Sequence, residues 1–260
     1  MRSNAPARQM AVLAAVVTLL VALVGCSSSK KSDSGKVAGT ITVFAAASLT
    51  GTFTELGKQF ESAHPGVKVK FDFEASSALS TQITQGAGAD VFASAATSNM
   101  DTVVKAGDAK DPKNFVKNVM EIAVPPSNPA NITSLQDLAK PTVKVALCQA
   151  QVPCGKTALM VFTNAKITVK PVTEEKDVKT TLAKVSSNEV DAGVVYVTDV
   201  KAAGTAVKGI EIPADVNAST EYPIAALSHS KHSPTAQAFV DFVLSSAGQS
   251  VLTAAGFSAP

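Results

Sequence analysis

The residues best placed for chemistry are small and polar, and they stand where predicted strands run into predicted helices. Ser48, Ser76 and Cys154 each occupy such a junction. The first N–H groups of a helix have no acceptor within it, and the helix dipole is positive there, so a junction of this kind suits an anion. Each serine has a second interpretation, in which its hydroxyl only caps the following helix. By local pattern, Ser77 is as good a candidate as Ser76.

Signatures of enzymatic chemistry are missing from the sequence. It contains no Gly-x-Ser-x-Gly, His-Glu-x-x-His or Cys-x-x-Cys pattern. Gly155-Lys156-Thr157 looks like the end of a phosphate-binding P-loop, but Ala150 stands where that pattern requires glycine. Pro153 also removes one of the N–H donors on which a P-loop depends. We therefore expect anion binding at this junction without nucleotide hydrolysis, and we predict that the chain is not an enzyme.

Cys148 and Cys154 lie six positions apart, and in an exported chain a disulfide between them is the expected outcome. A metal site is the alternative, but two sulfurs require two further ligands. The histidines His64, His229 and His232 are distant in sequence and show no ligand spacing. We expect no cofactor and no directly coordinated metal.

The N-terminal residues predict export. Arg2 and Arg8 precede the apolar run Ala11–Val24, which is too short to span a membrane comfortably and fits a secretory signal. The run ends in Leu23-Val24-Gly25-Cys26, which resembles the bacterial lipobox. This pattern predicts removal of residues 1–25, acylation of Cys26 and a flexible tether over residues 26–39. An ordinary signal peptide cleaved elsewhere is the alternative.

Composition and charge indicate a globular α/β protein. The chain has 260 residues, of which 46% are hydrophobic, and its net charge of +2 gives no reason to expect nucleic acid as a partner. Strand-like and helix-like segments alternate, which predicts a mostly parallel sheet with helices on both faces. The predicted strands are 41–47, 67–73, 90–94, 119–124, 143–147, 193–197 and 222–227, and the predicted helices are 49–60, 78–85, 100–106, 134–140, 155–164, 176–187, 234–245 and 247–255.

Two α/β lobes follow from this alternation. We predict that residues 40–119 and 222–260 form lobe I and that residues 120–221 form lobe II. The chain would cross between the lobes near Val119–Val124 and again near Thr220–Leu227, and the helical tail would return to lobe I.

Several sequence blocks resemble the molybdate-binding proteins of ABC importers, and together they cover most of the predicted mature domain in order. The blocks are Val43-Phe44-Ala45-Ala46-Ala47-Ser48-Leu49-Thr50, Ala75-Ser76-Ser77-Ala78-Leu79-Ser80-Thr81-Gln82-Ile83, Gly88-Ala89-Asp90-Val91-Phe92-Ala93-Ser94-Ala95, Val152-Pro153-Cys154-Gly155, Asp177-Val178, Gly193-Val194-Val195-Tyr196-Val197-Thr198-Asp199 and Glu221-Tyr222-Pro223. The resemblance implies a hinged, two-lobed type II binding fold. It also implies that a tetrahedral oxyanion is held without any charged side chain.

The same resemblance implies a set of ligand contacts. These are the hydroxyl and N–H groups of Ser48 and Ser76, the backbone N–H groups of Cys154 and Val178, and the hydroxyl of Tyr196, with Ser77 as a possible additional contact. The departure is Cys154, where the family usually has a plain small residue. A backbone contact tolerates that change.

The implied function is capture of molybdate, and also tungstate, at the extracytoplasmic face of the cell membrane by a lipid-anchored monomer. The partners implied are a membrane permease and its cytosolic ATPase. A receptor for sulfate or another oxyanion is one alternative, and an exported phosphohydrolase-like enzyme is a second. A site made only of donors would reject an oxyanion that carries a proton, so we expect phosphate to be excluded, and sulfate to be excluded by its size.

Overall fold

The computed structural model describes residues 35–260. The predicted signal peptide, the lipidation site Cys26 and residues 26–34 of the predicted tether lie outside the described residues. Within residues 35–260, no helix combines the length and apolar character that crossing a bilayer requires.

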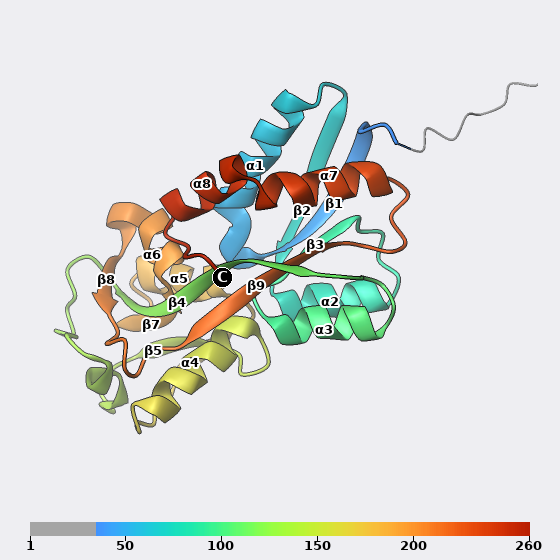
Figure 1. Cartoon of the computed structure of the whole chain (residues 1–260). Coiled ribbons are helices and arrows are strands. Elements are labelled where there is room, and N and C mark those ends of the chain that lie inside the picture. The colour runs from blue at the N-terminus through green and yellow to red at the C-terminus, as the bar shows by residue number, and fades with distance from the viewer. Residues whose placement is uncertain (1–34) are drawn as a thin grey trace, which may run out of the picture. The chain divides into compact units, whose positions relative to one another are not determined.

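Nine strands within residues 35–260 form one mixed sheet in the order β2-β1-β3-β9-β4-β7-β5-β6, with β8 paired to β4 (Figure 1). Pairing is parallel among β1, β2 and β3 and among β5, β6 and β7, whereas β4, β8 and β9 pair antiparallel. The α/β prediction is confirmed. The strands are β1 (Gly39–Ala46), β2 (Val67–Glu74), β3 (Val91–Ala93), β4 (Lys113–Val124), β5 (Val145–Cys148), β6 (Thr173–Glu175), β7 (Ala192–Tyr196), β8 (Lys208–Glu211) and β9 (Ser219–Ala226).

Helices connect these strands and cover the sheet. The α-helices are α1 (Thr50–Ala63), α2 (Ser76–Thr84), α3 (Thr97–Lys105), α4 (Pro153–Asn164), α5 (Val178–Ser186), α6 (Val197–Ala203), α7 (Ser233–Leu244) and α8 (Ser246–Ala254). Short 3-10 helices are η1 (Ala47–Leu49), η2 (Leu135–Ala139) and η3 (Gly204–Ala206).

Alternation along β1, β3 and β9 separates two cores on opposite faces of this part of the sheet. Side chains such as Val43 and Ile224 belong to the core shared with α1, α7 and α8. Neighbouring positions such as Phe44 and Ala225 belong to the core shared with α2 and α3. Successive side chains of a strand point to opposite faces, so one run of residues supplies both cores. Figure 1 shows the two groups of helices on either side of these strands.

A third core surrounds β5 and β7 and includes residues of α4 and α5. Strands β4 and β9 run between this third core and the other two cores. They pair with each other antiparallel, from Lys113 opposite Ile224 to Val119 opposite Ser219. The predicted crossing segments fall on these two strands. The residue bounds of the lobes stay a prediction.

Several predicted elements differ from the observed ones. The predicted helix 134–140 is the 3-10 helix η2, and it is capped by Ser134 instead of Thr133. Pro141 follows, and a residue before proline avoids the helical region, so Lys140 is extended and the helix stays short. The strand predicted to end at Val197 ends at Tyr196, and residues 197–203 form α6. Strands β6 and β8, each three or four residues long, were not predicted.

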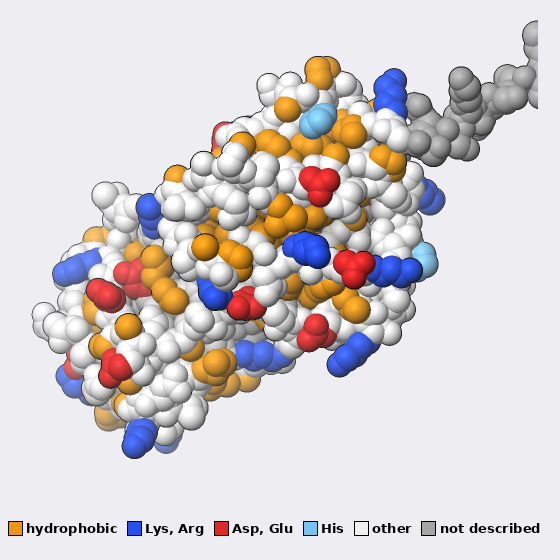
Figure 2. Space-filling model, in the orientation of Figure 1, with side chains coloured by type: hydrophobic (Ala, Val, Ile, Leu, Met, Phe, Trp, Pro, Cys, Tyr) orange, Lys and Arg blue, Asp and Glu red, His pale blue; other side chains and the backbone are white. Residues whose placement is uncertain are grey.

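Charges of both signs are interspersed over the surface that Figure 2 shows, without a continuous area of one sign. This distribution agrees with the net charge of +2.

Candidate functional site

A small cavity of about 20 Å³ lies where N-terminal ends of helices from both halves of the sheet meet. All five residues predicted to contact a ligand line it: Ser48, Ser76, Cys154, Val178 and Tyr196. Ser77 is not among the lining residues, so the structure favours Ser76 of the two neighbouring serines. The volume is close to what one ordered water requires, which restricts the site to a compact guest.

Four helix starts supply backbone donors to this cavity. Ser48 lies within η1, Ser76 is the first residue of α2, Cys154 is the second residue of α4, and Val178 is the first residue of α5. N–H groups at these positions have no acceptor within their own helices, and the positive ends of the helix dipoles meet at one point. A compact anion would satisfy both the donors and the dipoles.

The capping interpretation of the two serines is wrong. The N-cap of α1 is Leu49, and the N-cap of α2 is Ala75, in both cases without a side-chain capping bond. Ser48 lies inside the 3-10 helix η1, which ends before α1 begins, and Ser76 already lies inside α2. Their hydroxyls serve other partners.

Each serine hydroxyl connects the site to a neighbouring strand or loop. Ser48 Oγ lies 2.9 Å from the hydroxyl oxygen of Tyr222, on β9. Ser76 Oγ accepts a hydrogen bond of 2.9 Å from the N–H of Ala95, just after β3. Both serines are buried, with exposed fractions of 7% and 0%. Their positions are therefore fixed before any ligand arrives.

Tyr196, the last residue of β7, is 1% exposed, and among the described residues its hydroxyl oxygen has no hydrogen-bond partner. Burial raises the pKa of this phenol well above its usual value, and the neighbouring Tyr222 adds to the shift. The hydroxyl therefore keeps its proton at physiological pH and remains a donor. A buried polar group without a partner is costly, which marks this hydroxyl as one that an incoming ligand completes.

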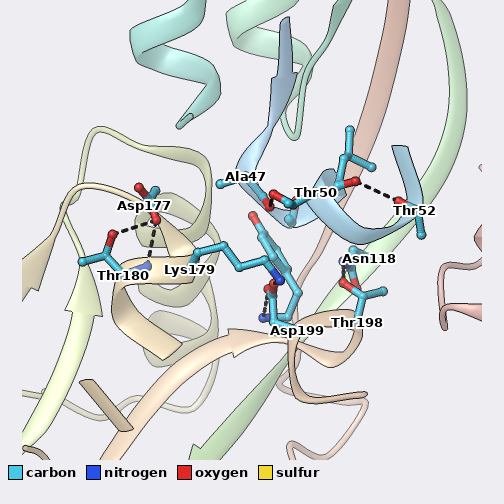
Figure 3. Close-up of polar contacts among 12 residues, drawn as sticks. Ala47, Thr50, Thr52, Asn118, Asp177, Lys179, Thr180, Thr198 and Asp199 are labelled. Carbon is cyan, nitrogen blue, oxygen red and sulfur yellow. Dashed lines mark hydrogen bonds and ion pairs between the residues drawn. The ribbon is translucent and has the colours of Figure 1, made fainter. Parts of the chain in front are cut away.

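Two acidic residues also line the cavity, Glu74 and Asp177, whereas no lysine or arginine of the described chain does. Both carboxylates accept hydrogen bonds from the protein, so the expectation that no charged side chain holds the anion stays a prediction. Glu74 Oε2 accepts a hydrogen bond of 2.9 Å from the Gln82 amide. Asp177 Oδ1 accepts bonds from the N–H and the hydroxyl of Thr180, at 2.8 and 2.9 Å, and so caps α5 (Figure 3). Glu74, at the end of β2, thus accepts from α2, and Asp177 accepts from the helix that it caps.

An ion pair between a buried carboxylate and a partly exposed lysine lies beside Tyr196. Asp199, in the first turn of α6, is fully buried, and its Oδ1 lies 2.9 Å from Nζ of Lys179. Its Oδ2 accepts a hydrogen bond of 3.3 Å from the backbone N–H of Tyr196. Burial raises the pKa of Asp199, and the ammonium of Lys179 opposes that shift.

Cys148 and Cys154 form a disulfide that ties the end of β5 to the start of α4. The loop between them is also held by the Gln149 N–H, which donates to the carbonyl of Glu175 at 2.8 Å. A Cβ atom at Gly155 would collide with the Gln149 carbonyl, so the loop packs directly on the first turn of α4. This packing fixes where the N–H of Cys154 points.

Sequence reasoning missed four residues that support the site: Asn118, Lys179, Asp199 and Tyr222. Asn118, on β4, donates to Thr198 Oγ1 at 2.8 Å (Figure 3). One available signal was the tyrosine count, because the chain has only two tyrosines and both meet here, with ring centroids 6.2 Å apart. Within residues 35–260, no cluster of three or more histidine, cysteine, aspartate or glutamate side chains could hold a metal ion.

Comparisons with known proteins identify the family of the chain as a whole. The model of the family described as "Bacterial extracellular solute-binding protein" matches residues 41–258. Molybdate-binding protein ModA of Mycobacterium tuberculosis (strain ATCC 25618 / H37Rv) is 42% identical over 247 residues, which cover 93% of this chain and 95% of that protein. The putative ABC transporter substrate-binding lipoprotein YvgL of Bacillus subtilis (strain 168) is 31% identical over 97% of this chain and 99% of its own length.

The fold agrees with a solved structure of the same kind. The periplasmic molybdate-binding protein of Azotobacter vinelandii has a TM-score of 0.74 over 85% of this chain and 99% of that one, at 18% identity. This likeness supports the two-lobed type II fold. The extent of the family match and of the identity to curated relatives shows that the chain belongs to the bacterial extracellular solute-binding proteins and is related to their molybdate-binding members.

Proposed function

We propose that this protein captures molybdate between its two lobes, outside the cytoplasm, and delivers it to an ABC importer. The observation that carries the proposal is the buried Tyr196 hydroxyl, which has no partner among the described residues and lines a cavity built from four helix starts. Relatives whose names state molybdate binding support the choice of ligand.

The donor set suits a dianion. A hydrogen bond to a charged group contributes about 1.5–3 kcal/mol, and each helix N-terminus adds about 0.3–1 kcal/mol. Several such contacts, reduced by desolvation of the anion and by the cost of closure, leave micromolar to nanomolar affinity, about −8 to −12 kcal/mol. Ser48, Ser76 and Tyr196 would supply hydroxyls, and Ser48, Ser76, Cys154 and Val178 would supply N–H groups.

Selectivity would come from geometry, because every donor that lines the cavity is neutral. Fixed N–H and hydroxyl groups discriminate by the size of the anion. Tungstate has the same shape and charge as molybdate and would bind as well. Sulfate is smaller and would leave some of these donors unsatisfied.

Anchoring through an acylated Cys26 would hold the monomeric receptor at the membrane, near a permease driven by a cytosolic ATPase. The lipobox-like sequence supports this part of the proposal, as does a relative whose name includes the word lipoprotein. Mass spectrometry of the membrane-extracted protein tests it, since acylation changes the mass of the N-terminal peptide.

The test of ligand identity is a thermal-unfolding panel with molybdate, tungstate, sulfate and phosphate, followed by calorimetry. We expect molybdate and tungstate to raise the unfolding temperature, because a ligand that binds only the folded state stabilises it. Sulfate and phosphate should give little change at the same concentration. Sulfate binding as tight as molybdate binding would overturn the proposal.

A further inference from the structure

A lysine lies next to the cavity, but its charge is directed elsewhere. Lys179 follows Val178, which lines the cavity, and it lines a neighbouring hollow of about 390 Å³ together with Ser48. Its side chain extends from α5 toward Asp199 (Figure 3), where Nζ lies 2.9 Å from Oδ1. The lysine thus adjoins residues that line the anion cavity, and yet its ammonium is ion-paired with a carboxylate.

The carboxylate of Asp199 is held in place by burial and by a backbone hydrogen bond. It is fully buried, and its second oxygen accepts the N–H of Tyr196 at 3.3 Å. A buried carboxylate that loses its cation leaves an uncompensated charge, so the pair resists separation. Within residues 35–260, Lys179 forms an ion pair with Asp199 and with neither acidic residue of the cavity, and those two carboxylates accept bonds from Gln82 and Thr180.

We propose that Asp199 sets the anion selectivity of the site by holding the Lys179 ammonium out of the cavity. The inference rests on the proposed oxyanion function. A free ammonium is a mobile point charge with three donors, and it would attract any small anion whatever its shape. Fixed neutral donors bind tightly only an anion whose size and shape let it accept from all of them. Asp199 is therefore a positioning residue that acts through Lys179.

The test is calorimetry with molybdate, sulfate and phosphate on the wild-type protein, Asp199→Asn and the double variant Lys179→Met/Asp199→Asn. Asp199→Asn keeps an acceptor for the Tyr196 N–H and releases the lysine. We expect the affinity for sulfate and phosphate, relative to molybdate, to rise about tenfold or more. The double variant should return this ratio to within about threefold of wild type, because the lysine is then absent.

Other outcomes contradict the inference in distinguishable ways. An unchanged ratio in Asp199→Asn overturns it, and so does an equal loss of affinity for all three anions in both variants, which would indicate a structural role. If Asp199→Asn does not fold, the double variant decides, since a loss of molybdate affinity of about tenfold would mean that Lys179 contacts the ligand. A wild-type protein that binds none of the anions defeats the proposed function as well, whereas tight molybdate binding with an unchanged ratio defeats this inference alone.

Discussion

Two buried tyrosines meet at the site, and they differ in what their hydroxyls do. The hydroxyl of Tyr222 lies 2.9 Å from Ser48 Oγ, whereas that of Tyr196 has no partner within residues 35–260. Burial raises the pKa of both phenols, so both stay protonated. One hydroxyl therefore organises the protein, and the other is available to a ligand.

Replacing Tyr196 by phenylalanine separates these roles. We expect Tyr196→Phe to leave the stability of the ligand-free protein unchanged or slightly higher, because the hydroxyl has no hydrogen-bond partner within residues 35–260. Molybdate affinity should fall by about 1.5–3 kcal/mol, which is the contribution of a hydrogen bond to a charged group. Chemical denaturation and calorimetry measure the two quantities.

Tyr222→Phe is the matched control. It removes a hydroxyl that already has a partner, so the ligand-free protein should lose about 0.5–1.5 kcal/mol of stability. If Tyr196→Phe destabilises the ligand-free protein as much as Tyr222→Phe does and leaves molybdate affinity intact, the assignment of Tyr196 to the ligand is wrong.

At the scale of single elements, the start of α4 depends on a glycine. A Cβ at Gly155 would meet the backbone carbonyl of Gln149, which cannot move away as a flexible side chain could. We expect Gly155→Ala to cost about 1–3 kcal/mol of stability, as overpacking does. It should also weaken molybdate binding, because the N–H of Cys154 shifts with the helix start.

Gly51 provides the comparison within α1. Nothing lies within 4 Å of a Cβ at this position, so Gly51→Ala should stabilise the protein by about 0.5–1 kcal/mol without changing affinity. Unfolding in denaturant and calorimetry on both variants check these expectations. Equal effects of the two substitutions would contradict the role assigned to the packed loop.

Strands β4 and β8 carry an unfavourable pair, Glu121 opposite Glu211. Burial raises the pKa of Glu121, and the charge of Glu211 adds to the shift. The folded state therefore holds this proton more tightly than the unfolded state does. The associated stability is complete at pH values below the normal glutamate pKa and is lost as the pH rises through the raised value.

Glu121→Gln should remove the loss of folding stability that wild type shows as the pH rises through the raised pKa of Glu121. We expect the variant to gain about 0.5–1 kcal/mol over wild type at pH 7, an estimate that allows for solvent screening of a half-exposed group, and to gain much less at pH 4. Glu211→Gln relieves the same repulsion from the other strand. Thermal unfolding at the two pH values decides, and an equal gain at both would rule out an ionic origin.

For the whole molecule, ligand binding and folding are linked. At a molybdate concentration of 100 times Kd, the folded state gains about 2.7 kcal/mol. For a domain of this size, that gain corresponds to a rise in unfolding temperature of about 5–10 °C. Tungstate should give a similar rise. No rise with either anion, in protein shown to be folded and ligand-free, would contradict the proposed receptor.

The sequence predicted those elements and site residues that depend on neighbouring residues, and it missed those that depend on contacts between distant parts of the chain. Residue alternation identified the central strands and most helices, because burial of one face imposes a period. Helix α6 was missed, since Val197 continues the apolar run of β7, and β6 and β8 are too short to show a period. The strand-to-helix junctions predicted Ser48, Ser76 and Cys154, whereas Val178 and Tyr196 were implied only by the family resemblance. Ser76 and Ser77 were equivalent until the structure placed only Ser76 at the cavity.

Contacts between distant segments lay beyond such patterns. Ser48 and Tyr222 are 174 positions apart, and the cross-strand pair Glu121 and Glu211 lies on strands that sequence alone did not bring together. The pairing of Lys179 with Asp199 was not predicted for the same reason, because Lys179 falls on a predicted helix and Asp199 falls outside every predicted helix.

The helix starts that line the cavity have a consequence for how such a protein changes over generations. A backbone N–H is present whatever side chain the residue carries, and proline alone removes it. Mutations at Cys154 or Val178 can therefore change the side chain and keep the backbone N–H donor, provided that the helix still begins at the same residue. Selection acts on the geometry of the helix start, so receptors of this kind can drift apart in sequence at the site itself while holding the same guest.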